Sequence, residues 1–142
     1  MVNTELNIMI IDDDILSLET LHRALELHGY RSTKFADPRI AIKEFAKDRF
    51  HIVLTDYKMP GLNGIELARL MKKIDPQVKI IIFTGYYDKE KHEQSIKLGV
   101  HNFLCKPLDI EKLIENLRTI EINHKNSIPN KRTTEKNISE NK

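Results

Sequence analysis

Polar groups that can take part in chemistry stand directly after four short apolar runs of this chain. They are an acidic triplet, a single acid, a hydroxyl and an amine: Asp12-Asp13-Asp14, Asp56, Thr84 and Lys106. Carboxylates held close together repel one another and are partly protonated unless a cation joins them. Carboxylate oxygens and water suit Mg²⁺, so Asp12, Asp13 and Asp56 are candidate ligands of that ion if the fold brings them together.

The hydroxyl and the amine have a use beside such a site. Thr84 ends its apolar run, and Lys106 is followed by Pro107. An ammonium at the mouth of an acidic metal site can pair with an anion that is placed against Asp56. A cis Lys106–Pro107 bond would aim the ammonium inward, and proline makes that isomer accessible. Asp14 has a simpler expected role, because acids are favourable at the positive N-terminus of a helix.

Apolar strands and amphipathic helices alternate five times along the chain. Strands are expected at 6–11, 31–35, 51–56, 79–83 and 102–105. Helices are expected from Ile15 to the glycine at 29, from Asp37-Pro38 past Phe45, at 65–74, at 88–98, and from Asp109 past Ile120. Continuous apolar strands indicate a sheet that is covered on both faces. Right-handed crossovers then give a doubly wound three-layer α/β sandwich, which binds ligands at the carboxyl ends of its strands.

The order of these residues resembles the receiver domain of two-component response regulators. The resemblance covers about Leu6 to Ile122. It is carried by Asp12-Asp13, by Asp56 with Met59-Pro60-Gly61 after it, by Thr84-Gly85 and by Lys106-Pro107. It implies a flavodoxin-like, five-stranded parallel sheet with the strand order 2-1-3-4-5.

The resemblance also implies a role for each acid. Asp56 would be the phosphoacceptor. Asp13 would bind Mg²⁺ directly and Asp12 through water, and the main-chain carbonyl of Lys58 would be a further ligand.

Three further residues receive roles from the resemblance. Thr84 would bond the phosphoryl group once it is on the acceptor, and Lys106 would pair with its charge. Phe103 falls at the position of the switch aromatic and would fill space that Thr84 vacates. The helix expected at 88–98 is the most polar one, so the least apolar area holds it down and it should move most easily.

The implied function is signalling. The chain would take a phosphoryl group from a sensor histidine kinase or a histidine phosphotransfer protein, and it would catalyse only its own phosphorylation and dephosphorylation. An unknown downstream protein would then recognise the fourth helix, fifth strand and fifth helix. Lys58 and Tyr86 depart from the family at positions that tune dephosphorylation. His101-Asn102 replace an acidic pair that accompanies dimerisation in part of the family.

Two other functions fit parts of the pattern. In a phosphatase of the haloacid-dehalogenase type, Asp12 would be the nucleophile, with Asp14, a strand-end threonine and a later lysine. That fold also needs an acidic pair after a further strand, and the later acids of this chain lie on an expected helix. A flavodoxin-like binding module is the non-catalytic alternative, but three aspartates after the first strand would repel a flavin phosphate.

The composition limits the domain organisation and the cellular location that are expected for this protein. The chain has 142 residues, a formal net charge of +2 and one cysteine, so it has the length of one domain and cannot form an internal disulfide. No basic surface for nucleic acid, no secretory leader and no membrane-inserting run is evident, which favours a cytoplasmic protein. We expect a receiver domain at 1–122 and a disordered polar tail at 123–142. Cys105 is expected to be a small buried residue.

Overall fold

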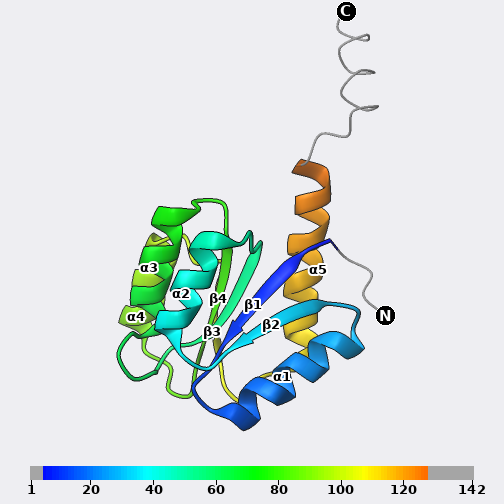
Figure 1. Ribbon diagram of the computed structural model, residues 1–142. Coiled ribbons are helices and arrows are strands. Elements are labelled where there is room, and N and C mark those ends of the chain that lie inside the picture. Colours follow the sequence, from blue (N-terminus) through cyan, green and yellow to red (C-terminus); the bar gives the residue numbers. More distant parts are fainter. Residues whose placement is uncertain (1–4, 128–142) are drawn as a thin grey trace, which may run out of the picture.

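The computed structural model describes residues 5–127 and alternates strands with helices throughout (Figure 1). The strands are β1 (Asn7–Ile11), β2 (Arg31–Phe35), β3 (Ile52–Asp56), β4 (Lys79–Thr84) and β5 (Asn102–Cys105). The helices are α1 (Ile15–Leu27), α2 (Pro38–Lys47), α3 (Gly64–Ile74), α4 (Lys89–Lys97) and α5 (Ile110–Ser127). All neighbouring strands are parallel, in the order β2-β1-β3-β4-β5, so the predicted sheet is confirmed.

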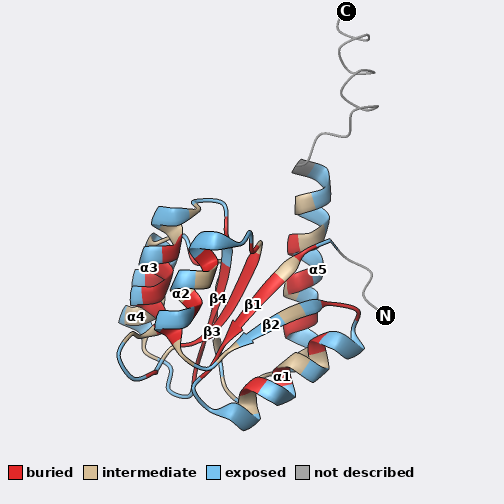
Figure 2. Ribbon diagram, in the orientation of Figure 1, coloured by how far each residue is buried: buried red, intermediate tan, exposed pale blue. Residues whose placement is uncertain are grey.

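The sheet separates two apolar cores (Figure 2). One core lies between the sheet and the helices α2 and α3, with Leu98 after α4 packed against it, and the other lies between the sheet and α1 and α5. Every residue of β3 is buried, the apolar run 52–54 together with the polar Thr55 and Asp56. The inner face that was predicted for α5 is buried as well: Leu113, Ile114, Leu117 and Ile120.

The helices begin near the positions that the sequence predicts, and side chains cap their first N–H groups. Asp14 accepts hydrogen bonds from two N–H groups of α1, and Asp37 caps α2 with proline at the first helical position. At the start of α3, Asn63 and Glu66 form a capping box. Asp88 caps α4. These local hydrogen bonds fix the residue at which each helix begins, after the loop that follows a strand.

One expectation for the later part of the chain differs from the structure. Cys105 is exposed because it ends the edge strand β5, so the expectation of a buried thiol was wrong. Helix α5 continues to Ser127, past the expected boundary at Ile122. The remainder of the expected tail, 128–142, lies outside the described residues. Among the helices that the structure describes, none has the length and apolarity needed to span a bilayer.

Candidate functional site

The carboxyl ends of four strands meet at one edge of the sheet. Asp12 follows β1, and Asp56 is the last residue of β3. Thr84 is the last residue of β4, and Lys106 follows β5. Because β1, β3, β4 and β5 are successive neighbours in the sheet, the fold gathers the polar groups that the sequence singles out.

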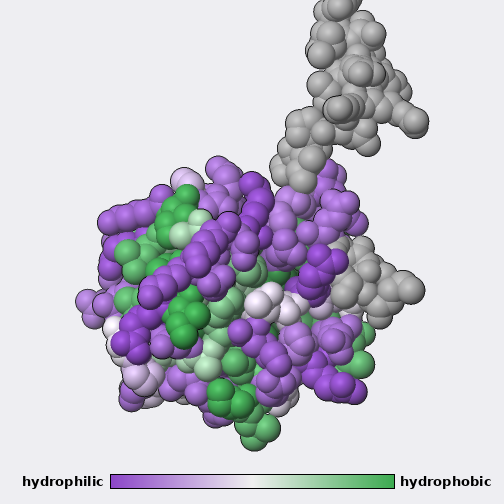
Figure 3. Space-filling model, viewed as in Figure 1, coloured by the Kyte–Doolittle hydropathy of each residue, from purple (hydrophilic) through white to green (hydrophobic). Residues whose placement is uncertain are grey.

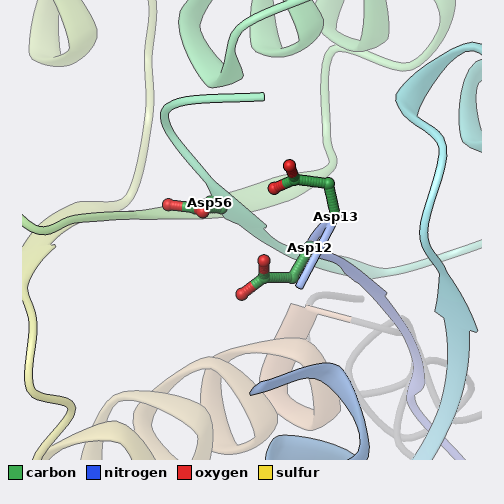
Figure 4. A group of neighbouring side chains, drawn as sticks. All are labelled: Asp12, Asp13 and Asp56. Carbon is green, nitrogen blue, oxygen red and sulfur yellow. The ribbon is translucent and has the colours of Figure 1, made fainter. Parts of the chain in front are cut away.

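Asp12, Asp13 and Asp56 form a cluster of carboxylates that extend to the same side of the strand ends (Figure 4). One oxygen of each lies within 4.8 Å of the others. Asp12 and Asp56 are buried, whereas Asp13 is exposed. Burial raises the pKa of Asp12 and the charge of Asp56 adds to this, while a hydrogen bond from the N–H of Asp14 acts in the opposite direction. This donor set fits Mg²⁺, because a cation would relieve the unfavourable charge with the oxygen ligands it prefers.

Lys106 supplies positive charge to the same cluster. Its Nζ lies 3.2 Å from Oδ2 of Asp56 and 3.8 Å from Oδ2 of Asp12. The Lys106–Pro107 peptide bond is cis, and the N–H of Lys106 donates to the carbonyl of Thr84 at 2.7 Å. The backbone of Lys106 is therefore bonded to β4 while its side chain reaches the end of β3. An anion bound at Asp56 would meet this ammonium.

The two oxygens of the Asp56 carboxylate have different partners. Oδ1 accepts a hydrogen bond from the N–H of Tyr57 at 2.9 Å, and Oδ2 faces Lys106. The hydroxyl of Thr55 donates to the carbonyl of Asp56 at 2.9 Å. The carboxylate of Asp56 thus contacts its own strand end on one side and the lysine that follows β5 on the other.

Gly64 is a part of the site that the sequence did not reveal. Its N–H donates to the carbonyl of Tyr57 at 2.7 Å. A Cβ on Gly64 would lie 2.7 Å from the carbonyl oxygen of Asp56 and 3.1 Å from Cα of Tyr57. Only glycine lets α3 begin this close to the loop after β3. The available signal was a glycine at the first helical position, where most other residues favour the helix more.

The two predicted switch residues, Thr84 and Phe103, contact other groups than the carboxylates. The hydroxyl of Thr84 donates to the carbonyl of Tyr86 at 2.9 Å and accepts from its N–H at 3.2 Å. Phe103 is 5% exposed and belongs to the core between the sheet and the helices α2 and α3. Lys58 is exposed, and the role of its carbonyl as a metal ligand stays a prediction.

Comparison with known proteins identifies the class that this fold and site define. The response regulator receiver domain family matches residues 8–118, so the chain belongs to that family. Receiver domains of this family bind Mg²⁺ in an acidic pocket, which here corresponds to the carboxylate cluster. Membership does not favour the phosphatase alternative with Asp12 as nucleophile.

Two curated relatives show different contexts for such a domain. The phosphoglycerate transport system transcriptional regulatory protein PgtA of Salmonella typhimurium is 41% identical over 115 residues, which are 80% of this chain and 28% of that protein. Sporulation initiation phosphotransferase F of Bacillus subtilis is 33% identical over 106 residues, 75% of this chain and 86% of that protein. The chain therefore spans less than a third of the first relative and most of the second.

Solved structures agree with the fold. A receiver domain protein from Clostridium thermocellum has a TM-score of 0.82 at 27% identity, covering 87% of this chain and 99% of that one. A CheY-like receiver domain protein from Methanospirillum hungatei has a TM-score of 0.80 at 28% identity, covering 86% and 98%. The predicted flavodoxin-like receiver architecture is confirmed by both.

Proposed function

We propose that Asp56 accepts a phosphoryl group from a phosphohistidine of a sensor histidine kinase or a histidine phosphotransfer protein. The observation that carries this is the position of Asp56, which ends the central strand within the carboxylate cluster and lies 3.2 Å from an ammonium. An oxygen of Asp56 attacks phosphorus, the P–N bond breaks, and its electron pair stays on the imidazole nitrogen. Mg²⁺ held by Asp12, Asp13, Asp56 and the carbonyl of Lys58 supplies charge neutralisation at the phosphoryl oxygens when it is bound.

Lys106 and Thr84 act on the transferred group. The Lys106 ammonium already faces Asp56, so it neutralises a phosphoryl oxygen without a large rearrangement. The Thr84 hydroxyl must first give up its bond to the carbonyl of Tyr86, because its single proton is donated there. Phosphorylation would therefore release the backbone that begins the loop before α4.

The chain catalyses no reaction on a separate substrate in this proposal. Water attacks the phosphorus of the aspartyl phosphate, inorganic phosphate leaves, and the carboxylate of Asp56 is restored. Lys58 and Tyr86 are both exposed near the loops that flank the acceptor. Because these two residues follow Asp56 and Thr84 by two positions, they would influence how water reaches the phosphorus and so set the lifetime of the signal.

The phosphodonor must dock beside the acceptor, and the surface next to it is apolar. Ile15 and Leu16 at the start of α1 are 59% and 76% exposed. Figure 3 shows an apolar patch at the end of the molecule where α1 begins in Figure 1. A groove of about 310 Å³ adjoins this patch and runs between α1 and the β5–α5 loop; Asp12, Leu21, Lys106 and Leu108 contribute to its lining. A donor helix seated here would bring its phosphohistidine to Asp56.

The acceptor is tested by intact-mass measurement after incubation with acetyl phosphate and Mg²⁺. Wild type should gain one phosphoryl group and Asp56→Asn should gain none. Equal labelling of both would remove Asp56 from this role, and loss of labelling only in Asp12→Asn would restore the phosphatase alternative. Asp13→Ala should abolish both Mg²⁺ binding and labelling.

The docking surface is tested with two leucines of the same helix. Leu16→Glu should slow phosphotransfer from the kinase but leave labelling by acetyl phosphate unchanged, since a small donor needs no docking. Leu27 is 73% exposed at the other end of α1, so Leu27→Glu is the matched control and should leave both rates unchanged. Equal rates of transfer to Leu16→Glu and wild type would place the kinase elsewhere.

Downstream, we propose that a partner protein recognises α4, β5 and α5, without direct binding of nucleic acid and without membrane insertion. Support comes from α4, which is polar and of which only Ser95 is buried. PgtA is named a transcriptional regulatory protein and the sporulation protein a phosphotransferase, so either kind of output suits a domain of this family. A cytoplasmic location stays a prediction.

A further inference from the structure

A cavity of about 280 Å³ lies at the end of the sheet where the strands begin, opposite the carboxylate cluster. The residues around it come from the chain just before β1 and β3, from the start of β4 and from the last turns of α5, which pass beside this end of the sheet (Figure 1). Three buried apolar side chains and three side chains with N–H donors contribute to its lining: Leu6, Val78, Ile120, Arg49, His51 and Lys79. A ligand bound here would be separate from the phosphoryl group.

Hydrogen bonds tie the three polar residues of this cavity to the strand starts. The N–H of His51 donates to the carbonyl of Asn7 at 2.9 Å, and the N–H of Lys79 donates to the carbonyl of His51 at 3.0 Å. The side-chain amide of Asn7 donates to the carbonyl of Arg49 at 3.2 Å. The backbone at all three positions is therefore held in place before any ligand binds.

The imidazole of His51 has a hydrogen-bond donor left for a ligand. Its Nδ1 accepts the N–H of Asn7 at 3.0 Å, so in the neutral ring the proton is on Nε2. Burial lowers the pKa of His51, and the charge of His124 lowers it further, which keeps the ring neutral. The remaining nitrogen thus carries an N–H and not a lone pair, which suits an anion and not a metal ion.

Positive charge around the cavity is not balanced by ion pairs. Neither Arg49 nor Lys79 pairs with an acid within residues 5–127. The charge of Arg49 adds to the effect of burial on the pKa of His51. Burial likewise lowers the pKa of Lys72 and that of His101, and the charge of Lys79 adds to both shifts. An anion between the two cations would relieve this unfavourable charge.

The nearby negative groups already have partners of their own. Asp75 is the acid among the described residues that line the cavity, and its Oδ1 accepts the N–H of Gln77 at 3.0 Å. Two carbonyls of the turn after α3 accept hydrogen bonds from Nζ of Lys72, at 2.6 and 3.3 Å, so this lysine complements the negative end of the helix. Asp75 offsets part of the positive charge, but Arg49 and Lys79 keep their donors for a ligand.

We propose that this cavity binds a small organic anion, with its charged head against Arg49, Lys79 and His51 and its apolar body against the buried side chains of the lining. A guanidinium can donate two parallel hydrogen bonds to a carboxylate or to a phosphate. The volume is at the lower limit of ligand pockets, so the ligand must be small. Because α5 and the starts of three strands all contribute to the lining, the bound anion would connect them and stabilise the folded domain.

The experiment titrates benzoate and phenyl phosphate into the full chain at constant ionic strength without Mg²⁺, and it follows amide chemical shifts. Shifts should change at His51, Gln77 and Lys79, and the probe that binds more tightly identifies the charged head. Benzyl alcohol keeps the aromatic body without the charge, and acetate keeps the charge without the body. Each of these two should bind at least about tenfold more weakly than benzoate.

Three variants test which residues recognise the anion. Arg49→Gln and Lys79→Gln each remove one charge from an exposed side chain, so both should fold, and each should weaken binding of the tighter probe about tenfold. Lys73→Gln is the matched control, because Lys73 is exposed on α3 without lining the cavity, and it should bind like wild type.

Three results would overturn the proposal. They are wild-type affinity in both Arg49→Gln and Lys79→Gln, equal binding of benzyl alcohol and benzoate, and shift changes confined to the carboxylate cluster. Asp56→Asn should bind the probe like wild type, so this test does not depend on the proposed phosphorylation.

Discussion

The ammonium of Lys106 lies 3.2 Å from Oδ2 of Asp56, although the two residues come from opposite sides of strand β4. The side chain of Asp56 is 12% exposed and that of Lys106 is 32% exposed, so water screens this pair only in part. The positive charge is therefore in place before any anion arrives at the acceptor.

Removal of this charge should slow phosphorylation. In Lys106→Met, negative charge that develops on the phosphoryl oxygens is no longer balanced, and the rate of labelling by acetyl phosphate should fall about 100-fold. Lys112→Met on the exposed side of α5 is the control and should label like wild type. Mass spectrometry over time measures both rates. An unchanged rate in Lys106→Met would show that the ammonium has no part in the transfer.

Asp12→Asn should stabilise the fold at neutral pH when Mg²⁺ is removed. Burial raises the pKa of Asp12 in the folded protein above its ordinary value of 3.8. The folded state then binds more protons than the unfolded state between the two pKa values, so this group's contribution to stability decreases as pH rises through that window. At neutral pH the charged form is unfavourable, and its removal should add about 1 kcal/mol to the free energy of unfolding.

The same variant separates stability from metal binding. Urea unfolding with and without Mg²⁺ should show that the ion stabilises wild type, because it binds only the folded state. Asp12→Asn should show little of this effect, since one of the three carboxylates of the cluster is lost. Lower stability of Asp12→Asn in the absence of Mg²⁺ would contradict the unfavourable charge of Asp12.

Gly64→Ala should destabilise the protein and disturb the acceptor. The added Cβ would lie 2.7 Å from the carbonyl oxygen of Asp56, and a backbone atom cannot move aside as a flexible side chain can. We expect a loss of about 2 kcal/mol in the free energy of unfolding, which is typical of overpacking. Gly85→Ala is the matched control, because a Cβ there has nothing within 4 Å. Equal free energies of unfolding for Gly64→Ala and Gly85→Ala would show that α3 can move away from the loop after β3.

His51 lies at the opposite end of the sheet from the carboxylate cluster. It should make the stability of the protein depend on pH. Its Nδ1 accepts the N–H of Asn7 at 3.0 Å, so protonation at that nitrogen would break the bond. Burial lowers the pKa of His51 below 6.5, and the charges of His124 and Arg49 act in the same direction. The unfolded state therefore binds more protons between the folded and unfolded pKa values, and stability should decrease as pH falls below about 6.5.

A substitution isolates the contribution of His51. Burial also lowers the pKa of His101, so wild type carries at least two such groups. In His51→Asn, the amide oxygen can replace Nδ1 as acceptor without titrating. Urea unfolding at about pH 7.5 and about pH 5.5 should therefore show a smaller difference in this variant than in wild type. An equal difference would mean that His51 is not responsible.

Much of the secondary structure was predictable because its signals are local. The predicted bounds of β2 and β5 are those observed, since turn residues and prolines flank both strands. Asp37 and Asp14 mark the starts of helices because a cap acts on N–H groups two or three residues away. The strand order, by contrast, was implied by resemblance to a family and not by the residues alone.

Burial at the sheet edge and the arrangement of the site depended on tertiary structure. Cys105 follows an apolar run but is exposed, because β5 has a neighbour on only one side. The burial of Phe103 in the core between the sheet and the helices α2 and α3 also involves contacts between distant parts of the chain.

The sequence by itself determined which residues can do chemistry: the acids, the threonine and the lysine that end the apolar runs. Only the tertiary structure decided that Lys106 faces Asp56 and that Thr84 is bonded to Tyr86 instead. The physical reason is the distance along the chain over which each signal acts. Strand and cap signals act between neighbours in sequence, whereas distances and pKa shifts at a site depend on which strands pair and on how much water the helices exclude.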